Sequence, residues 1–302
     1  MGEITACGPE LKNFKVGDKV IVPWAISCGT CSHCLSNLTS KCTEAGDTMI
    51  SGFGFGESLG PWGGMVTDLI RVPHADFMLV KVPDGIDPAS LASASDNIPD
   101  GWRTVAPHLK KRPGAPVLVL GGSAASIGLY AAGIAVALGS SQVDYVDYDP
   151  DRLRIAKSLG ANPIQIPEKT KEKWYRQNSP GASGRYPIVA DCCMNEAGLN
   201  FGIRSLSAGG ICTSVGYYFK KGTSLPLLHM YANDSTFHTG ISHPRVTLPE
   251  VVDLVATKKF QPEKVTTVLA KWEHAEQAFL ERTTKVVVER PSMFANSSTT
   301  TT

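Results

Sequence analysis

Four cysteines lie within fifteen residues of one another, at Cys28, Cys31, Cys34 and Cys42. Four thiolates at this spacing, C-x2-C-x2-C-x7-C, can complete the tetrahedral shell of one zinc ion, and such a closed shell leaves no position for a substrate. Two alternatives remain. An iron–sulfur cluster uses similar crowding but usually other spacings, and two disulfides are disfavoured in a reducing compartment. The spacing therefore favours a structural zinc ion.

A glycine-rich loop follows a short apolar run, Val117–Leu120, whose length and β-branching are typical of a buried strand. The loop carries Gly121, Gly122 and Gly128, and an alanine-rich run to Leu138 behind it predicts a helix. Glycines in such a turn let the backbone approach a pyrophosphate, and the helix N-terminus attracts its charge. The loop is two residues longer than the usual G-x-G-x-x-G pattern, but its flanking strand and helix favour a dinucleotide site.

Asp147 ends the next predicted strand, Val143–Asp147, and lies 19 residues after Gly128. An acidic residue at about this separation holds the ribose hydroxyls of NAD. The same carboxylate would repel the 2′-phosphate of NADP, and Asp149 would strengthen that repulsion, so the sequence favours NAD. Arg152 has two interpretations, because it is placed either to read a 2′-phosphate or to pack on the adenosine.

The composition is that of an ordinary soluble enzyme. A chain of 302 residues is long enough for two domains, and a net charge of +1 gives no indication of a nucleic-acid partner. The sequence has no apolar run of membrane-spanning length, and we expect no signal peptide at its start. We therefore expect a cytoplasmic protein whose eight cysteines are metal ligands or free thiols.

Short strands with glycine and proline between them predict a compact β domain at the start of the chain. Lys15–Asp18 is typical of a turn, and strands are expected at Lys19–Pro23 and Met65–Val72. Beyond the glycine loop, strands and helices alternate, which predicts an α/β fold with a doubly wound parallel sheet. The expected elements are a helix through Leu159, the strand Tyr186–Asp191, the helix Ala197–Leu206, the strand Ile211–Gly216, the helices Pro249–Thr257 and Glu273–Arg282, and the strand Lys285–Glu289.

From Gly2 to about Arg290 the chain resembles the zinc-dependent medium-chain dehydrogenase/reductases, the alcohol dehydrogenase family. The resemblance rests on the Lys15–Asp18 turn, the four-cysteine segment, Gly63–Gly64 before the strand that ends at Pro73, the glycine loop with its flanking elements, and Val215–Gly216. It implies a GroES-like domain over residues 1–97 and a Rossmann-like NAD-binding domain over 98–245. Residues 246–302 are then expected to return to the first domain and to end in a disordered polar tail at 296–302.

The resemblance also implies roles for individual residues. Asp147 and Arg152 match the family's adenosine-ribose acid and a basic neighbour, and Val215 with Gly216 matches the strand end that faces the nicotinamide. Asp96 matches the third ligand of the catalytic zinc ion. The other two ligands in the family are a cysteine and the histidine of a Gly-His-Glu motif, and both would precede Met1.

The expected activity is NAD-linked hydride transfer between an alcohol and its carbonyl product, with zinc polarising the substrate oxygen. Because a catalytic zinc site needs three protein ligands, we expect a chain that lacks the family's N-terminal segment to be impaired. The alternative is an inactive fragment that binds NAD and zinc and acts through a partner; the zinc-free quinone reductase branch is disfavoured by the four cysteines. The expected partners are a small alcohol or carbonyl substrate and, as is common in the family, further copies of the chain.

Overall fold

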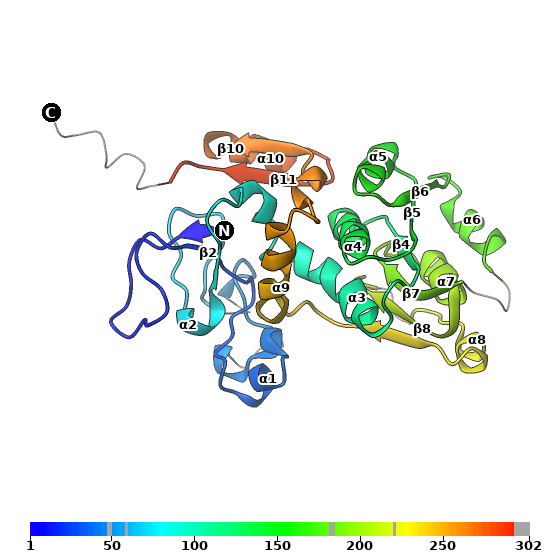
Figure 1. Cartoon of the computed structure of the whole chain (residues 1–302), viewed down its shortest axis with the longest axis horizontal. Helices are drawn as coiled ribbons and strands as arrows, with labels where there is room; N and C mark the ends of the chain where they lie inside the picture. Colours follow the sequence, from blue (N-terminus) through cyan, green and yellow to red (C-terminus); the bar gives the residue numbers. More distant parts are fainter. Residues whose placement is uncertain (47–49, 58–59, 181–184, 220–221, 293–302) are drawn as a thin grey trace. The chain divides into compact units, whose positions relative to one another are not determined.

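The computed structural model describes residues 1–46, 50–57, 60–180, 185–219 and 222–292. The chain forms two compact units (Figure 1). Unit 1 combines residues 1–99, 243–256 and 266–302, and unit 2 combines residues 100–242 and 257–265. No helix in the described ranges has both the length and the hydropathy to cross a lipid bilayer. The tail expected at 296–302 lies outside the described residues.

Unit 2 is built on a six-stranded sheet in the order β6-β5-β4-β7-β8-β9, and every neighbouring pair is parallel. The predicted doubly wound α/β architecture is therefore confirmed. Its strands are β4 (Val117–Leu120), β5 (Val143–Asp147), β6 (Asn162–Gln165), β7 (Tyr186–Asp191), β8 (Leu206–Ser214) and β9 (Thr236–Thr239). Its helices are α3 (Asn97–Lys111, which starts in unit 1), α4 (Ala125–Ala137), α5 (Pro150–Ser158), α6 (Lys171–Gln177), α7 (Glu196–Arg204), α8 (Leu227–Ala232) and the 3-10 turn η5 (Pro262–Val265).

Helices cover both faces of this sheet, which explains why its central strand β4 is apolar throughout (Figure 1). On one face, Leu118 and Leu120 of β4 form a buried cluster with Tyr175 of α6 and Phe201 of α7. On the other face α4 packs closely, and a Cβ at its Gly128 would lie 3.5 Å from the Tyr145 ring of β5. All four side chains of β4 are at most 1% exposed. The core of unit 2 thus holds the carboxyl ends of the strands in fixed positions.

Local signals explain where the helices of unit 2 begin. Asp149 caps α5 by accepting from the amides of Asp151 and Arg152, and Pro150 occupies the first turn, where its missing N–H has no cost. Asn195 caps α7 in the same way by accepting from the Gly198 amide. These caps fix the turns that follow β5 and β7, two of the strand ends that form the candidate site.

Unit 1 contains a three-stranded antiparallel sheet and a separate parallel pair of strands. The sheet is formed by β1 (Gly2–Glu3), β2 (Lys19–Ile21) and β3 (Val80–Lys81), and the pair by β10 (Val268–Lys271) and β11 (Val286–Glu289). Its helices and 3-10 turns are α1 (Ser32–Leu35), η1 (Thr39–Lys41), η2 (Thr43–Ala45), α2 (Ala75–Met78), η4 (Pro88–Leu91), α9 (Pro244–Ala256), η6 (Trp272–His274) and α10 (Ala275–Leu280).

One predicted strand is wrong. Residues Met65–Val72 form bends and irregular chain. Val66 and Leu69, two of the apolar residues behind that prediction, are 63% and 61% exposed, so they do not supply a buried face. The predicted helix Pro249–Thr257 is real but begins earlier, at Pro244, with Pro249 inside it.

Candidate cofactor and metal sites

The four cysteine sulfurs of unit 1 lie together, all within 4.8 Å of one another. The Sγ atoms of Cys28 and Cys34 are 4.0 Å apart, and those of Cys31 and Cys42 are 3.9 Å apart. Zinc–sulfur bonds of about 2.3 Å in a tetrahedron place sulfurs about 3.8 Å apart. The four cysteines are free thiols, and no disulfide joins them. The donor set and its geometry therefore fit one tetrahedral metal ion.

Backbone amides point at these sulfurs and favour their thiolate form. The amides of Thr30 and Cys31 each donate to Cys28 Sγ at 3.3 Å, and the Cys28 amide donates to Cys42 Sγ at 3.3 Å. Burial raises the pKa of Cys28, but the Thr30 hydroxyl and the amides of Thr30 and Cys31 outweigh it, so its pKa is lowered overall. At Cys34 and Cys42 burial has the larger effect, and the pKa of each thiol is raised. His33 is not needed as a ligand, and its Nδ1 lies 2.6 Å from the Lys41 carbonyl oxygen.

Contacts around the cysteine lobe, residues 28–42, hold it against the rest of unit 1. Gly29 has φ of +82°, and a Cβ there would lie 2.5 Å from the Phe77 ring of α2. Arg245 of α9 places its guanidinium 5.0 Å from the centre of that ring and donates to the Phe77 carbonyl. The Ser40 amide donates to Nδ1 of His243 at 3.0 Å. The lobe is thus held by residues distant in sequence.

In unit 2, the glycine loop lies where the strand order changes direction, between β4 and β7. Gly122 has φ of +147°, and a Cβ there would lie 2.9 Å from the Cys193 Cα. A Cβ on Gly121 would collide with Asp147 and Tyr145. Ala124, at the N-cap of α4, offers no side-chain acceptor to the first-turn amides. A glycine loop at this position, followed by a helix N-terminus without a side-chain cap, fits a pyrophosphate.

Asp147 and Arg152 are brought together, but they bind each other. Asp147 is fully buried, and its Oδ1 accepts from the amides of Tyr148 at 2.7 Å and Asp149 at 3.1 Å and from Arg152 Nη2 at 2.7 Å. Its Oδ2 accepts from the Tyr145 hydroxyl and from Arg152 Nε, both at 2.8 Å. Burial alone would lower the pKa of Arg152, but its bonds to Asp147 raise it. Both carboxylate oxygens of Asp147 are therefore engaged by Arg152.

Val215 and Gly216 follow β8 and are positioned by a second buried acid, Asp191, at the end of β7. The Asp191 carbonyl accepts from the Val215 amide at 3.0 Å, and its Oδ2 accepts from the hydroxyls of Ser214 and Tyr218, both at 2.7 Å. The Gly216 amide donates in turn to Ser214 Oγ at 3.0 Å. Sequence reasoning missed Asp191, although an acid that ends a buried strand is the same signal that singled out Asp147.

Asp96 lies in unit 1, just before α3. Its Oδ2 accepts from the side-chain amide of Asn97 at 3.3 Å, and Asn97 Oδ1 accepts from Lys285 Nζ at 2.6 Å. Burial lowers the pKa of Lys285, and the charge of Asp96 partly opposes this shift. Within the described residues, the cysteine lobe is the one group of three or more histidine, cysteine or acidic ligand atoms, and Asp96 is outside it. The donor set around Asp96 therefore does not fit a catalytic zinc ion.

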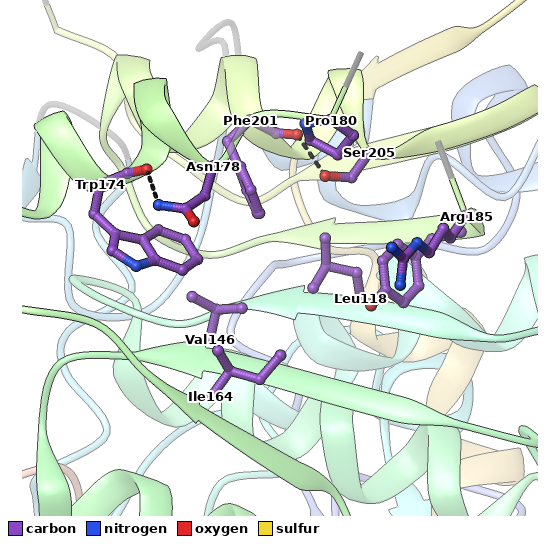
Figure 2. Close-up of a pocket in the computed structure, with 10 residues that line it drawn as sticks. Leu118, Val146, Ile164, Trp174, Asn178, Pro180, Arg185, Phe201 and Ser205 are labelled. Atoms are coloured by element: carbon purple, nitrogen blue, oxygen red, sulfur yellow. Dashed lines mark hydrogen bonds between the residues drawn. The ribbon is translucent and has the colours of Figure 1, made fainter. Parts of the chain in front are cut away.

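A cavity of about 360 Å³ lies apart from these residues, between the sheet and the pair α6 and α7 (Figure 2). Its walls include Leu118 and Val146 from the strands and Trp174 and Phe201 from the helices. The Asn178 side chain is held by the Trp174 carbonyl at 2.9 Å. The cavity shares no residue with the glycine loop, and we assign it to imperfect packing of the helical layer.

Two family models match the chain. The alcohol dehydrogenase GroES-like domain matches residues 1–84, and the zinc-binding dehydrogenase model matches residues 126–257, so together they cover more than two thirds of the chain. A probable zinc-binding alcohol dehydrogenase of Mycobacterium tuberculosis is 27% identical over 279 residues, which cover 92% of this chain and 68% of the relative. The glutathione-independent formaldehyde dehydrogenase of Pseudomonas aeruginosa is 30% identical over 202 residues, 65% of this chain and 48% of the relative.

Solved structures agree with the family models. The alcohol dehydrogenase of Thermus sp. ATN1 matches with a TM-score of 0.82 and 27% identity, over 95% of this chain and 82% of its own. An Escherichia coli dehydrogenase complexed with NADH shares the fold, with a TM-score of 0.77 and 18% identity over 96% of this chain and 82% of its own. The chain therefore belongs to the zinc-dependent medium-chain dehydrogenase/reductase family and is an alcohol dehydrogenase-like oxidoreductase of the zinc type.

Proposed function

We propose that this chain binds NAD in unit 2 and one structural zinc ion in unit 1. The observation that carries the proposal is the glycine loop at the point where the strand order changes direction between β4 and β7, because its glycines and the N-terminus of α4, which has no side-chain cap, suit a pyrophosphate. Asp147 with Arg152 would bind the adenosine end, and Val215 with Gly216 would face the nicotinamide. When bound, NAD supplies the hydride acceptor for oxidation of an alcohol.

The chain's own residues perform the positioning steps of this proposal. Asp191 holds Ser214 and Tyr218, and through them the turn that carries Gly216, so the nicotinamide would meet a fixed surface. The cysteine lobe would hold its zinc ion away from the chemistry, because four sulfurs leave no coordination position for substrate. The substrate would be a small alcohol or the corresponding carbonyl compound.

Hydride transfer is proposed to be slow in this chain. Asp96 accepts a hydrogen bond from Asn97, which in turn binds Lys285, and no group of three or more ligand residues in the described part of the chain includes Asp96. Loss of the charge stabilisation that a metal gives a developing alkoxide costs about two to three orders of magnitude or more in rate. A protein that binds the cofactor without efficient turnover is therefore favoured over a fully active dehydrogenase.

The test combines three measurements on the full chain: fluorescence titration with NADH, metal analysis, and an assay of alcohol oxidation. The expected result is saturable NADH binding, one zinc ion per chain, and almost no turnover. Absence of NADH binding would refute the cofactor assignment. Rapid zinc-dependent oxidation, or two zinc ions per chain, would refute the assignment of Asp96.

A second candidate function is assembly with further copies of this chain. Five large apolar or aromatic side chains of unit 2 are at least 67% exposed and lie close together in sequence: Tyr217, Phe219, Leu227, Leu228 and Tyr231. Exposed groups of this kind mark interaction surfaces. Light scattering should give a homo-oligomer, and the double substitution Leu228→Ser with Tyr231→Ser should shift it towards monomer. An unchanged mass would refute a role for this surface.

A further inference from the structure

A second cavity of unit 2, of about 710 Å³, lies between helices α6 and α7 and the segment that follows strand β8. Its volume is within the range of small-molecule sites, about 300–1,000 Å³. Helix α7 lines this cavity, which we call the α7 groove, with residues on one face, at a spacing of three, four and seven: Ala197, Asn200, Phe201 and Arg204. Among the described residues, none of the glycine loop lines it.

Hydrogen bonds join the walls of the α7 groove to one another. The Asn200 side-chain amide donates to the Ser224 carbonyl at 2.9 Å and ties the segment after β8 to α7. The Asn195 side-chain amide donates to Glu172 at 3.2 Å and ties the start of α7 to α6. The hydroxyl of Tyr218, another lining residue, bonds to the acid that ends β7 at 2.7 Å. The groove is thus preformed, which lowers the entropic cost of binding a ligand.

Arg204 brings an uncompensated positive charge to the α7 groove. Its side chain has no ion pair or hydrogen bond within the described residues, whereas Arg176, a second arginine of the groove, is paired with Glu172 at 3.4 Å. Burial and the charge of Arg204 together lower the pKa of His229 on α8. The C-terminus of α7 offers Arg204 only a partial negative charge. The group that best complements Arg204 is therefore an anion.

Two exposed aromatic rings also line the α7 groove. The ring centres of Tyr217 and Phe219 are 6.0 Å apart, and the angle between the ring planes is 18°. Tyr217 is 68% exposed and Phe219 is 89% exposed, so their faces are open to a planar apolar ring. We propose that the α7 groove binds a small aromatic carboxylate, with its ring against Tyr217 and Phe219 and its carboxylate on Arg204.

The charges of the groove favour one negative charge over two. Glu196 also lines the groove and lies eight residues before Arg204, which is about 12 Å along the helix axis. One unpaired arginine balances one negative charge, and Glu196 would repel a second. A carboxylate therefore suits the groove better than a phosphate dianion. This site is separate from the proposed NAD site, and its occupation does not depend on NAD.

Calorimetric titration of the full chain with 2-naphthoate tests the proposal, with 2-naphthamide as an uncharged probe of similar shape. We expect saturable binding of 2-naphthoate and at least tenfold weaker binding of the amide. Arg204→Met should weaken 2-naphthoate binding by about 10- to 100-fold, the range for a hydrogen bond to a charged group. The control Arg154→Met, which changes an exposed arginine of α5 outside the groove, should leave the affinity unchanged.

A second variant tests the aromatic wall. Phe219→Ala changes a side chain that is almost fully exposed, so the fold should be kept, and 2-naphthoate binding should weaken by about 2- to 10-fold. Tyr231→Ala is the matched control, because Tyr231 is 87% exposed but does not line the groove. Its affinity for 2-naphthoate should equal that of the unmodified chain.

Each outcome decides the proposal. Absence of 2-naphthoate binding, or equal affinity for the amide, would overturn it. Unchanged affinity in Arg204→Met would place the probe elsewhere and would also overturn it. Displacement of 2-naphthoate by saturating NADH would assign the probe to the cofactor site, with the same consequence. Should Arg204→Met fail to fold by circular dichroism, the comparison of Phe219→Ala with Tyr231→Ala decides.

Discussion

His108 makes the stability of unit 2 depend on pH. Its imidazole lies between α3 and β8, 3.0 Å from the Thr213 hydroxyl, and it is half-buried. Burial lowers its pKa from 6.5 to about 4, with further contributions from the charges of His238 on β9, of Lys111 at the end of α3, and of Arg112 directly after it. The folded state therefore keeps this histidine neutral at pH values where the unfolded chain protonates it.

The sign follows from proton linkage. Between pH 6.5 and pH 4 the unfolded state binds more protons at His108, so stability is complete above pH 6.5 and falls as the pH drops towards 4. With pKa values of 6.5 in the unfolded chain and about 4 in the folded chain, protonation of His108 lowers the free energy of unfolding by about 2 kcal/mol at pH 5. Because the imidazole is partly exposed, solvent screens the penalty, and we expect about 1–2 kcal/mol.

His108→Gln tests this reasoning, since glutamine can still bond to Thr213 but does not titrate. Urea unfolding followed by circular dichroism at pH 8 and pH 5 should show that the variant loses about 1–2 kcal/mol less stability than the unmodified chain. His274→Gln, which changes an exposed histidine of unit 1, should follow the unmodified chain. Equal losses in the unmodified chain and His108→Gln would refute the assignment.

Two further predictions concern the metal and the cofactor. Cys31→Ser should release the zinc ion and lower the thermal midpoint of unit 1, because metal binding contributes to the folding free energy. The control Cys7→Ser, which changes an exposed thiol, should keep one zinc ion per chain by metal analysis. Retained metal in Cys31→Ser would contradict the four-sulfur site. The unmodified chain should bind NADH more tightly than NADPH in parallel titrations. Asp147→Asn frees Arg152 for a 2′-phosphate and should reduce the ratio of the NADPH and NADH dissociation constants by about tenfold. An unchanged ratio would show that Asp147 does not bind the ribose.

Much of unit 2 could be predicted from its sequence because its strands carry strong local signals. The predicted bounds of β4, β5 and β7 coincide with those observed. Helix α3 was not predicted, because Gly101 and Pro107 are poor helix formers and packing decides its conformation. A Cβ at Gly101 would lie 2.9 Å from the Ala131 amide of α4, so the glycine is needed for close contact between the two helices.

The sequence predicted which residues form the candidate metal and cofactor sites better than it predicted which of them bind one another. The cysteine lobe was found from its spacing, because its ligands are local. The pairing of Asp147 with Arg152 was not, since local spacing fits several conformations of Arg152 and burial selects one. The contacts of Asp191 with Tyr218 and of Arg103 with Ser214 join residues 27 and 111 positions apart, and no local pattern encodes such separations.

The interleaved order of the two units has a consequence for synthesis on the ribosome. Residues 100–242 separate the first stretch of unit 1 from the segments that complete it. At about 5–20 residues per second, translation of that insert takes on the order of ten seconds. During this interval Ser40 lacks its partner His243. The four cysteines span only residues 28–42, so a zinc ion bound there would cross-link them before these contacts form and would shield their thiols from oxidation until the chain is finished.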